Sequence, residues 1–402
     1  MRKKKILITA HSMEIGGIER SLVGLLDVID YERYDVDLLL FSRKGELLPF
    51  VNERCTVLPQ IAQCATMLEP IRDVLLHGHV LLASARLLSR ARMHFKYKAV
   101  SDSQRADAMG YALLQSHWDA SVRFMPPLRG EYDAAISFMW PHHYVAQKVQ
   151  AKKKFAWIHT DFTMMDMDKE KDARIWSQFD RIAAVSDECG AAFLQVYPQF
   201  RDKLVTIENI LPQSFVRKSA AEFEPQEMQG EGYRLLSVGR FCFAKAFDRA
   251  AKVSRILKDR GVPFCWYIVG YGGGEAQLRA QIADSGVEDC FVLLGKKSNP
   301  YPYMAACDLY LQPSRYEGKA VTVREAQMLA RPVLITDFKT ARSQVRDGFD
   351  AVIAPQDETA LADAIESLLR DEDLRKTLSE NTKTADYSNT AEIEKIYSLI
   401  EE

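Results

Sequence analysis

The sequence predicts an α/β protein with two successive doubly wound domains, and its length and its hydrophobic rhythm are the observations that predict this. A chain of 402 residues exceeds what one ordinary hydrophobic core supports. Short apolar runs alternate with amphipathic helical patterns, which is typical of parallel sheets covered by helices. The alternation stops over roughly 212–232, a polar interval, and then begins again. We therefore expect one domain over residues 1–208 and a second over residues 209–385, with ligands bound at the carboxyl ends of their strands.

The expected strands follow the apolar runs in chain order. After the first run, Ile18 to Ile29 carries apolar residues at helical spacing and predicts the first crossover helix. A helical pattern over about Ala391 to Ile400 ends the chain. In the first domain the runs are KILITA (5–10), VDLLLF (36–41), YDAAISFM (132–139), FAWIHT (155–160) and RIAAVS (181–186). In the second domain they are RLLSVGR (234–240), FCWYIVG (264–270), CFVLLG (290–295), LYLQPS (309–314), PVLIT (332–336) and DAVIAP (350–355).

Residues 71–125 interrupt this rhythm and predict a long, mainly helical insertion. Between Val74 and Val100 the sequence has no acidic residue. A basic amphipathic helix over about 80–100 can lie on an anionic membrane surface, and it can equally pack on its own domain with its basic side chains reaching solvent. Both hypotheses stay open. The basic residues are Arg86, Arg90, Arg92, Lys96 and Lys98, and they lie among Leu81, Leu82, Leu87, Leu88 and Phe95.

Composition and charge argue against several classes of protein. Hydrophobic residues make up 47% of the chain and charged residues 27%, as in globular proteins. A formal net charge of -2 argues against a nucleic-acid binder, because no overall field would attract phosphate backbones. The seven cysteines stand singly, without the spacing of a zinc site, and predict reduced thiols in a cytoplasmic protein. We expect no secretory signal, and no run reaches the roughly 20 apolar residues of a membrane-spanning helix.

The segment Glu317 to Glu325 is the main candidate for a binding site. It follows the run LYLQPS and leads into a predicted helix, on which Glu325 shares the apolar face of Val321 and Met328. A buried carboxylate needs a partner, and the hydroxyls of a sugar would serve. The alternative is a capping box formed by Thr322 and Glu325. The backbone amides at the helix start, expected to bind sugar oxygens or negative charge, are those of Gly318, Lys319, Ala320 and Val321.

Three further features are expected at the same cleft. Arg240 and Lys245 follow the first strand of the second domain, where two cations would neutralise a diphosphate, although loop cations are often merely solvated. Gly16 and Gly17 form a turn before the first helix, which accepts phosphate oxygens or is simply a tight turn. His159 ends the run FAWIHT and is either a site residue or a structural histidine.

Taken together, these segments resemble the retaining glycosyltransferases of family 4, among the glycosyl transferases group 1, which adopt the GT-B fold of two Rossmann-like domains facing across a cleft. The resemblance covers essentially the whole chain, and the order and spacing of its motifs are specific. It also implies that the helix over residues 386–402 packs back toward the first domain. The motifs are GGIERSL (16–22), WIHTD (157–161), SVGRFCFAK (237–245), YIVGYGGGE (267–275), LLGKKSNPYPYM (293–304), LQPSRYEG (311–318), the two glutamates at E-x7-E spacing and RPVLITD (331–337).

In the second domain the resemblance implies separate roles for the charged residues. Glu325 should hold the ribose of a nucleotide, and Glu317 with the amides after it should hold the hydroxyls of the donor sugar. Arg240 and Lys245 should bind the diphosphate, whose charge must be stabilised as the glycosidic bond breaks.

The resemblance also implies contacts from the remaining motifs. Gly16 and Gly17 should close over the diphosphate from the first domain, and His159 should face the donor sugar and the acceptor. The backbone around Gly295 and Lys296 should hold the base.

The implied activity is that of a retaining, metal-independent hexosyltransferase. Its co-substrate is a nucleotide sugar, with a UDP-sugar favoured over a GDP-sugar, and no cofactor is expected. The acceptor is a glycan or a lipid-linked sugar in capsular, exopolysaccharide or other cell-surface glycan synthesis, at the inner face of the cytoplasmic membrane. Two D-x-D pairs, Asp35 with Asp37 and Asp166 with Asp168, do not end a predicted strand and are not expected to bind a metal. A sugar-nucleotide epimerase on the same fold and a non-catalytic scaffold stay open as alternatives.

The sequence departs from the family pattern at three positions. Lys319 and Ala320 stand where many members have an aromatic or aliphatic residue followed by proline, and Ala246 replaces a glycine. These changes leave the donor sugar open, and Lys319 suggests a donor whose sugar is anionic.

Overall fold

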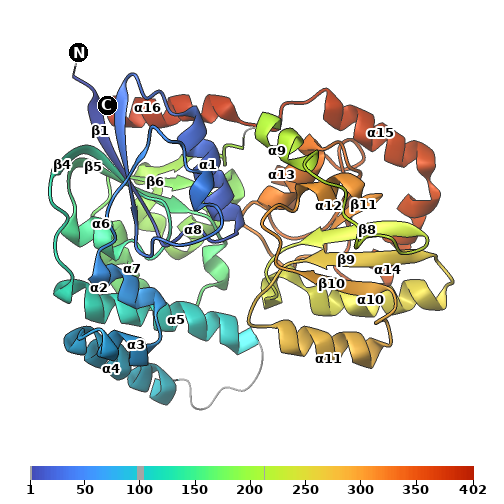
Figure 1. Cartoon of the computed structure of the whole chain (residues 1–402), viewed down its shortest axis with the longest axis horizontal. Helices are drawn as coiled ribbons and strands as arrows, with labels where there is room; N and C mark the ends of the chain where they lie inside the picture. Colours follow the sequence, from blue (N-terminus) through green and yellow to red (C-terminus); the bar gives the residue numbers. More distant parts are fainter. Residues whose placement is uncertain (1, 97–103, 212) are drawn as a thin grey trace. The chain divides into compact units, whose positions relative to one another are not determined.

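The computed structural model describes residues 2–96, 104–211 and 213–402, which form two compact α/β units (Figure 1). Unit 1 contains residues 1–210 together with 390–402, and unit 2 contains residues 211–389. Each unit has one parallel sheet with helices on both faces, as expected for doubly wound domains. The predicted fold class is therefore confirmed.

Unit 1 is built on a seven-stranded sheet with the strand order β3-β2-β1-β4-β5-β6-β7 and parallel pairing throughout. Its central strands are apolar on both faces because helices cover both sides, and Ile6, Leu7 and Ile8 of β1 are all buried. The strands are β1 (Lys4–Ala10), β2 (Tyr34–Leu40), β3 (Thr56–Val57), β4 (Glu131–Ser137), β5 (Gln150–Ile158), β6 (Arg181–Ala184) and β7 (Leu204–Thr206).

The last helix of the chain, α16 (Ile393–Glu401), belongs to unit 1. Its apolar face joins the core of that unit, and the Tyr397 hydroxyl accepts a hydrogen bond of 2.6 Å from the Asp30 amide. The ring of Tyr397 also stacks on Tyr34 at 4.9 Å. The other helices of unit 1 are α1 (Gly17–Val28), α2 (Ala62–Ala65), α3 (Ile71–Leu76), α4 (Val80–Lys96), α5 (Gln104–Ser121), α6 (His143–Lys148), α7 (Lys169–Trp176) and α8 (Asp187–Val196).

Unit 2 is built on a six-stranded parallel sheet with the strand order β10-β9-β8-β11-β12-β13. Successive residues of its strands alternate between two cores, with Leu235 and Trp266 in one and Leu236 and Tyr267 in the other. The strands are β8 (Tyr233–Val238), β9 (Phe264–Val269), β10 (Phe291–Gly295), β11 (Leu309–Gln312), β12 (Val333–Thr336) and β13 (Val352–Ala354). The helices are α9 (Gln213–Ala220), α10 (Phe247–Asp259), α11 (Glu275–Ser285), α12 (Tyr301–Ala306), α13 (Val321–Met328), α14 (Glu358–Arg370) and α15 (Glu372–Lys383).

All eleven apolar runs contain strands, whereas the short edge strands β3 and β7 were not expected. Neither has the long apolar run that marks a buried strand, since each pairs at the edge of the sheet. The polar interval after residue 212 begins with helix α9, which packs through Phe215 against Tyr301. In the predicted insertion the structure places α3, α4 and α5, while Lys98 and the side chain of Lys96 lie outside the described residues.

The seven cysteines are all free thiols, and six of them are buried, as the sequence predicts. Across the described ranges, no helix combines the length and the apolar character needed to cross a bilayer.

Candidate active site

The carboxylate of Glu317 lies just beyond the carboxyl end of β11 and is held through one oxygen. Its Oε1 accepts from Lys245 Nζ at 2.6 Å, from Ser314 Oγ at 2.6 Å and from Gln312 Nε2 at 3.1 Å. None of the described residues donates to the other oxygen, Oε2. Both the Glu317 and the Lys245 side chains are largely but not fully buried, with 13% and 18% of their surface exposed. The carboxylate is therefore oriented, with one oxygen left to accept from a ligand.

Gln312 orients this site from inside the sheet. Its amide nitrogen donates to Ser314 Oγ as well as to Glu317, and its amide oxygen accepts from Tyr310 at 2.9 Å and Thr322 at 3.1 Å. Both ends of the amide are thus used, which defines its orientation. Gln312 is 1% exposed, so this network is buried and rigidly supports the carboxylate.

Arg315 joins the loop that carries Lys245 to the turn that carries Glu317. Its guanidinium makes two hydrogen bonds to Asp248, of 2.8 and 2.6 Å, and lies 4.2 Å from the centre of the Phe243 ring. Burial alone would raise the pKa of the Asp248 carboxyl, but the hydrogen bonds and charge of Arg315 bring it below its usual value. This clamp explains how two residues 72 positions apart in sequence come into contact.

The residue after Lys245 has a backbone conformation that favours glycine. Ala246 has φ 55° and ψ 35°, in the left-handed region, and its side chain is completely buried. The family glycine at this position suits such a conformation better than alanine does. The departure from the family pattern is therefore tolerated locally, since Ala246 still begins helix α10.

The loop after β8 also packs closely against the loop after β9, and Gly270 makes this possible. A Cβ atom on Gly270 would lie 1.9 Å from the carbonyl oxygen of Gly239, next to the exposed Arg240. Gly273, three residues later in the same loop, has no heavy atom within 4 Å of its Cβ position.

Gly270→Ala is expected to destabilise unit 2 by about 3 kcal/mol, because the backbone of one loop must move. Gly273→Ala in the same loop is expected to change stability by less than about 0.5 kcal/mol. Urea unfolding of both variants measures the difference. Equal stability of the two variants would show that the loops are not in close contact.

Glu325 is fully buried on α13, as its predicted face requires. Its Oε1 accepts a hydrogen bond of 2.9 Å from the hydroxyl of Tyr301 on α12. The capping-box alternative is wrong, because the N-cap residue of α13 is Ala320 and Thr322 lies within the helix. The Thr322 hydroxyl donates a hydrogen bond to the side-chain oxygen of Gln312. A helix cap therefore does not explain why a carboxylate is buried at position 325.

The turn between Glu317 and α13 is held by a second loop, which the sequence did not reveal. Thr340 Oγ1 donates to the Glu317 carbonyl at 2.9 Å, and the Gln344 side-chain oxygen accepts from the Ala320 amide at 2.9 Å. The expectation that all four amides from Gly318 to Val321 are open to a ligand is thus wrong for Ala320. Gln344 uses that amide because the start of a helix leaves its first N–H groups without intrahelical partners.

Gly295 and Lys296 follow β10 at the same carboxyl edge of the sheet. Gly295 has φ +73°, and its carbonyl accepts from the Gly270 amide at 2.9 Å. The ammonium of Lys296 lies 4.6 Å from the centre of the Tyr271 ring. These contacts tie together the loops that follow β9 and β10.

In unit 1, Gly16 is the N-cap residue of helix α1, and Gly17 is the first residue within the helix. Gly16 is extended, and a Cβ atom there would lie 2.2 Å from Oε2 of Glu19. The carboxylate of Glu19 therefore lies beside the first turn of α1, where a negative group is favourable. A phosphate at this turn would meet that carboxylate.

His159 directly follows β5, and its ring is fixed to the neighbouring strand end. Its Nε2 lies 2.9 Å from the carbonyl oxygen of Phe138, so Nε2 carries the proton and Nδ1 is the acceptor nitrogen. Burial lowers the pKa of His159 to about 4, although the hydrogen bond to Phe138 raises it slightly. His159 is therefore a neutral imidazole at neutral pH.

Burial also lowers the pKa of three other histidines of unit 1. Burial lowers the pKa of His11 to about 4. Burial, with Arg86 and Arg90 nearby, does the same for His117. The pKa of His142 lies well below its usual value, through burial first and then through neighbouring histidines.

Acidification is therefore expected to destabilise unit 1 between about pH 6.5 and pH 4. The unfolded chain binds protons at its ordinary histidine pKa of about 6.5, whereas the folded chain does not, so stability present above pH 6.5 is lost as the pH falls. Each unit of pKa difference corresponds to about 1.4 kcal/mol per histidine. Burial raises the pKa of Asp172, and this carboxyl acts in the opposite direction.

Urea unfolding followed by tryptophan fluorescence at several pH values measures this loss, since four of the five tryptophans lie in unit 1. His11→Phe should flatten the pH dependence, because His11 packs between Phe41 and Trp118. His94→Gln, at an exposed position, should leave it unchanged. A stability that is constant from pH 7 to pH 5 would contradict the prediction.

Across the described part of the chain, no group of three or more His, Cys, Asp or Glu side chains is placed to hold a metal ion. Asp37 lies within β2 and binds Lys5 at 3.0 Å and the Tyr132 hydroxyl at 2.9 Å. Asp168 caps the start of α7 through the Lys171 amide. Neither D-x-D pair ends a strand.

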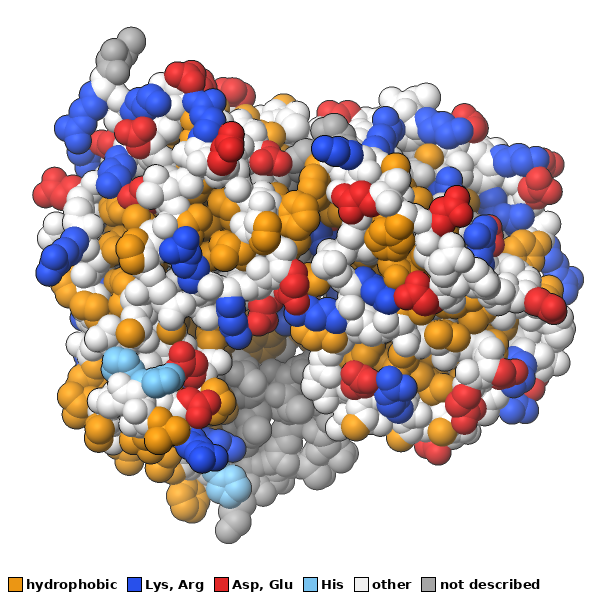
Figure 2. All heavy atoms as spheres, in the orientation of Figure 1, with side chains coloured by type: hydrophobic (Ala, Val, Ile, Leu, Met, Phe, Trp, Pro, Cys, Tyr) orange, Lys and Arg blue, Asp and Glu red, His pale blue; other side chains and the backbone are white. Residues whose placement is uncertain are grey.

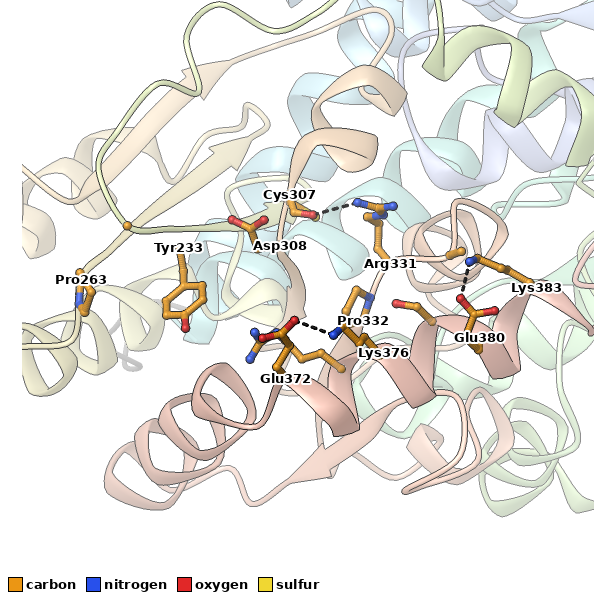
Figure 3. A pocket seen from close by; sticks show the side chains of 14 residues that line it. Tyr233, Pro263, Cys307, Asp308, Arg331, Pro332, Glu372, Lys376, Glu380 and Lys383 are labelled. Atoms are coloured by element: carbon orange, nitrogen blue, oxygen red, sulfur yellow. Dashed lines mark hydrogen bonds and ion pairs between the residues drawn. The ribbon is translucent and has the colours of Figure 1, made fainter.

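A surface pocket of unit 2 lies at the opposite edge of the sheet, beside the residues that precede β8, β11 and β12 (Figure 3). Its charged side chains are paired, with Lys376 on Glu372 and Lys383 on Glu380. Arg331 donates to the carbonyl of Cys307. Because ligands of doubly wound domains bind at the carboxyl ends of strands, this pocket is not the donor site.

The part of unit 2 that carries these charged residues matches a known family. Residues 219–385 match the family model described as "Glycosyl transferases group 1". This match covers most of unit 2. The match contains Lys245, Glu317 and Glu325, whose contacts are described above.

Curated relatives agree with this family. A segment is 35% identical over 138 residues to the amylovoran biosynthesis glycosyltransferase AmsK of Erwinia amylovora, and covers 32% of this chain and 34% of that protein. Another is 29% identical over 150 residues to the alpha-D-kanosaminyltransferase of Streptomyces kanamyceticus, and covers 37% and 39%. The chain thus spans little more than a third of the length of these relatives.

Solved structures show that the likeness in fold extends beyond this group 1 segment. TarM of S. aureus, in complex with fondaparinux, alpha-GlcNAc-glycerol and UDP, superposes with a TM-score of 0.70 and 16% identity over 100% of both chains. HepE of Anabaena in complex with UDP-glucose gives a TM-score of 0.69 and 16% identity, over 98% of this chain and 100% of HepE. The chain has the GT-B fold.

Sequence reasoning missed the residues that support Glu317, Lys245 and Glu325 in this candidate site. Gln312 and Ser314 gave a usable signal, since they are polar side chains at the end of a buried apolar run. Arg315 and Asp248, 67 positions apart, gave none. Tyr301 is a tyrosine on a short helix, and only the packing of α12 against α13 makes it a partner of Glu325.

Proposed function

We propose that this chain is a glycosyltransferase that moves a sugar from a nucleotide sugar to a glycan or lipid-linked acceptor, in polysaccharide or other cell-surface glycan synthesis. The observation that carries the proposal is the Glu317 carboxylate, which Lys245, Ser314 and Gln312 hold through a single oxygen. A fixed carboxylate with its second oxygen open is suited to accept from a sugar hydroxyl. The group 1 family of unit 2 supports the same reaction class.

The residues of unit 2 divide the work of binding the donor. Glu317 accepts from the donor sugar, and Glu325, buried on α13, accepts from the hydroxyls of the ribose. Lys245 and Arg240, on the loop after β8, face the diphosphate. When the donor binds, the Lys245 ammonium shifts part of its interaction from Glu317 to the phosphate, where negative charge grows as the glycosidic bond breaks.

We propose that transfer proceeds with retention and without a metal ion. Two cations on one loop supply the positive charge that a metal would otherwise bring to the diphosphate. The leaving phosphate then takes the proton of the acceptor hydroxyl as the new bond forms on the same face of the sugar. Unchanged activity in the presence of EDTA and an unchanged anomeric configuration in the product, measured by NMR, test both points.

A UDP-sugar is the favoured donor, and the ligands of structural neighbours support this. TarM and HepE were both solved with UDP or UDP-glucose, and the pneumococcal GtfA was solved with UDP and GlcNAc. In this chain, the backbone around Gly295 and Lys296 is proposed to hold the base. Lys319, partly exposed in the turn after Glu317, is proposed to favour an anionic donor sugar.

The acceptor is proposed to be lipid-linked, which would bring the protein to the inner face of the cytoplasmic membrane. One curated relative, from Campylobacter jejuni, is 29% identical over 152 residues and is named as acting on a diphospho-undecaprenol-linked sugar. That name supports a lipid-linked acceptor for this chain. It does not identify the sugars that such an acceptor would carry.

A thermal-shift panel of UDP, GDP, ADP and their sugars tests the donor. A ligand at about 100 times its dissociation constant adds about 2.7 kcal/mol of stability, so the true donor should stand out. Nucleotide released only when an acceptor is present would separate transfer from epimerisation. A panel in which no nucleotide stabilises the protein would refute the proposal and leave a non-catalytic scaffold.

A further inference from the structure

Helices α3 and α4 expose a face of large apolar side chains, here called the leucine face. Leu76 is 73% exposed, Leu88 62% and Phe95 74%, all unusual values for residues of this type. Figure 2 shows apolar side chains gathered over α3 and α4, with histidines and basic side chains beside them. The other members of the leucine face are Leu75 (47%), Val80 (58%), Leu81 (64%) and Leu87 (56%).

The leucine face is continuous along α4. Leu81, Leu88 and Phe95 follow each other at intervals of seven residues, which is two helical turns, so they form one line along the helix. Val80 and Leu87 lie beside that line. From Val80 to Phe95 the helix rises by roughly 22 Å, so the exposed stripe is long and straight.

The inner face of α4 carries little large apolar surface. It buries Leu82 and two small alanines together with Arg86 and Ser89, and the Arg86 guanidinium donates to the Thr66 carbonyl. Ser89 Oγ donates to the carbonyl of Arg86 at 2.9 Å. An ordinary surface helix keeps most of its large apolar side chains on the buried face, whereas α4 exposes Leu81, Leu87 and Leu88. This arrangement indicates that the outer face has an apolar partner outside the chain.

The leucine face does not belong to the main core. Helix α4 packs on α3 and α5, and among the described residues the apolar cluster beneath it contains Val74, Leu82 and Ala83, with Ile71 and Phe124 beside them. Within the described part of unit 1, the leucine face therefore does not contribute to the core.

Charge decides which partner fits. The exposed Arg90 and Arg92 lie on α4, and the chain has no acidic residue from Val74 to Val100. The acids that flank this stretch in sequence are Asp73 and Asp102, and on the N-terminal side Glu69 lies 3.3 Å from His77. A second copy of the chain would bring arginines against arginines, whereas an anionic lipid surface offers both apolar chains and phosphate groups.

We propose that the leucine face inserts into the interface of an anionic bilayer, with Arg90 and Arg92 at the level of the lipid phosphates. This deepens the proposed function by naming the surface that holds the enzyme near a lipid-linked acceptor. The inference rests on the proposed function only for the biological role of membrane binding, because binding to lipid itself needs neither donor nor acceptor. The sequence predicted that a basic helix could lie on a membrane through its charges. The leucine face adds an apolar contribution to that binding.

Sedimentation with vesicles at physiological salt tests the proposal, using phosphatidylcholine alone and an equal mixture of phosphatidylcholine and phosphatidylglycerol. The wild-type chain should sediment with the mixed vesicles. Leu81→Ser combined with Leu88→Ser should weaken this binding at least about tenfold, because two apolar side chains no longer enter the bilayer. Phe223→Ser, which removes an exposed aromatic side chain of unit 2, is the matched control and should bind as the wild type does.

A second pair of substitutions tests the charged part. Arg90→Gln with Arg92→Gln should reduce binding to the mixed vesicles by about tenfold and should make the remainder less dependent on salt. All variants should retain the wild-type thermal shift with the nucleotide donor, so loss of lipid binding and failure of the proposed reaction can be told apart.

Three results would overturn the proposal. The first is a wild-type chain that does not sediment with either kind of vesicle. The second is an equal loss of binding in Phe223→Ser. The third is a wild-type dimer in light scattering that Leu81→Ser with Leu88→Ser converts to a monomer, which would show that a second copy covers the leucine face.

Discussion

Lys245→Met is expected to lower kcat/KM for sugar transfer by about 10²–10³, the largest effect predicted for a single side chain of this protein. The methionine keeps the length and the apolar stem of lysine but removes the charge that faces the diphosphate. Fixed charges aimed at a developing negative charge are typically the largest single contribution to such catalysis. Initial rates of nucleotide release, with and without acceptor, measure the loss.

The same substitution should leave the fold intact. Glu317 keeps its hydrogen bonds from Ser314 and Gln312, and its side chain is in contact with solvent. The control is Lys252→Met on helix α10, whose lysine makes a surface ion pair with Glu358 at 3.2 Å and should be dispensable. Equal rates for the two variants would exclude Lys245 from the reaction.

Glu325→Gln is expected to weaken binding of the nucleoside diphosphate by about 10 to 100 times. Hydrogen bonds to a charged group contribute about 1.5–3 kcal/mol, and the amide accepts less strongly than the carboxylate and cannot accept on both of its ends. The isosteric change avoids a cavity at this fully buried position. Isothermal titration calorimetry with UDP measures the loss.

A double-mutant cycle with 2′-deoxy-UDP makes this test specific for the ribose. If Glu325 binds the 2′-hydroxyl, the deoxy ligand should cost the wild type as much affinity as the substitution does, and the two losses should not add. Tyr301→Phe is the matched structural variant, since it removes one donor to Glu325 and leaves the carboxylate itself in place. Fully additive losses would show that Glu325 acts through the packing of α13.

Much of the fold was predictable, because burial leaves a direct mark on local sequence. A strand covered by helices on both faces must be apolar at nearly every position, so runs such as LYLQPS and PVLIT identify strands without any tertiary information. The short strands β3 and β7 and the helix α9 have no such apolar run in the sequence. Their formation depends on neighbours that are distant in sequence.

The direction of Glu325 was also predictable, since helical spacing places it on the apolar face of α13. The capping box failed because it requires Thr322 to precede the helix, whereas the helix begins at Val321, two residues earlier than that requires. Helix ends are decided by contacts outside the helix, here by the Gln344 side chain on the Ala320 amide.

The sequence by itself determined the apolar runs, the order of the strands along the chain and the charged residues that follow them. Only the tertiary structure decided that Lys245 and Glu317 share one contact and that Gln312 and Arg315 hold them there. Parallel strands bring their carboxyl ends together whatever the separation in sequence, so such contacts have no local pattern. For the same reason, periodicity shows that α4 has an apolar face but not which face the protein covers, and only the structure shows that Leu81 and Leu88 point outward.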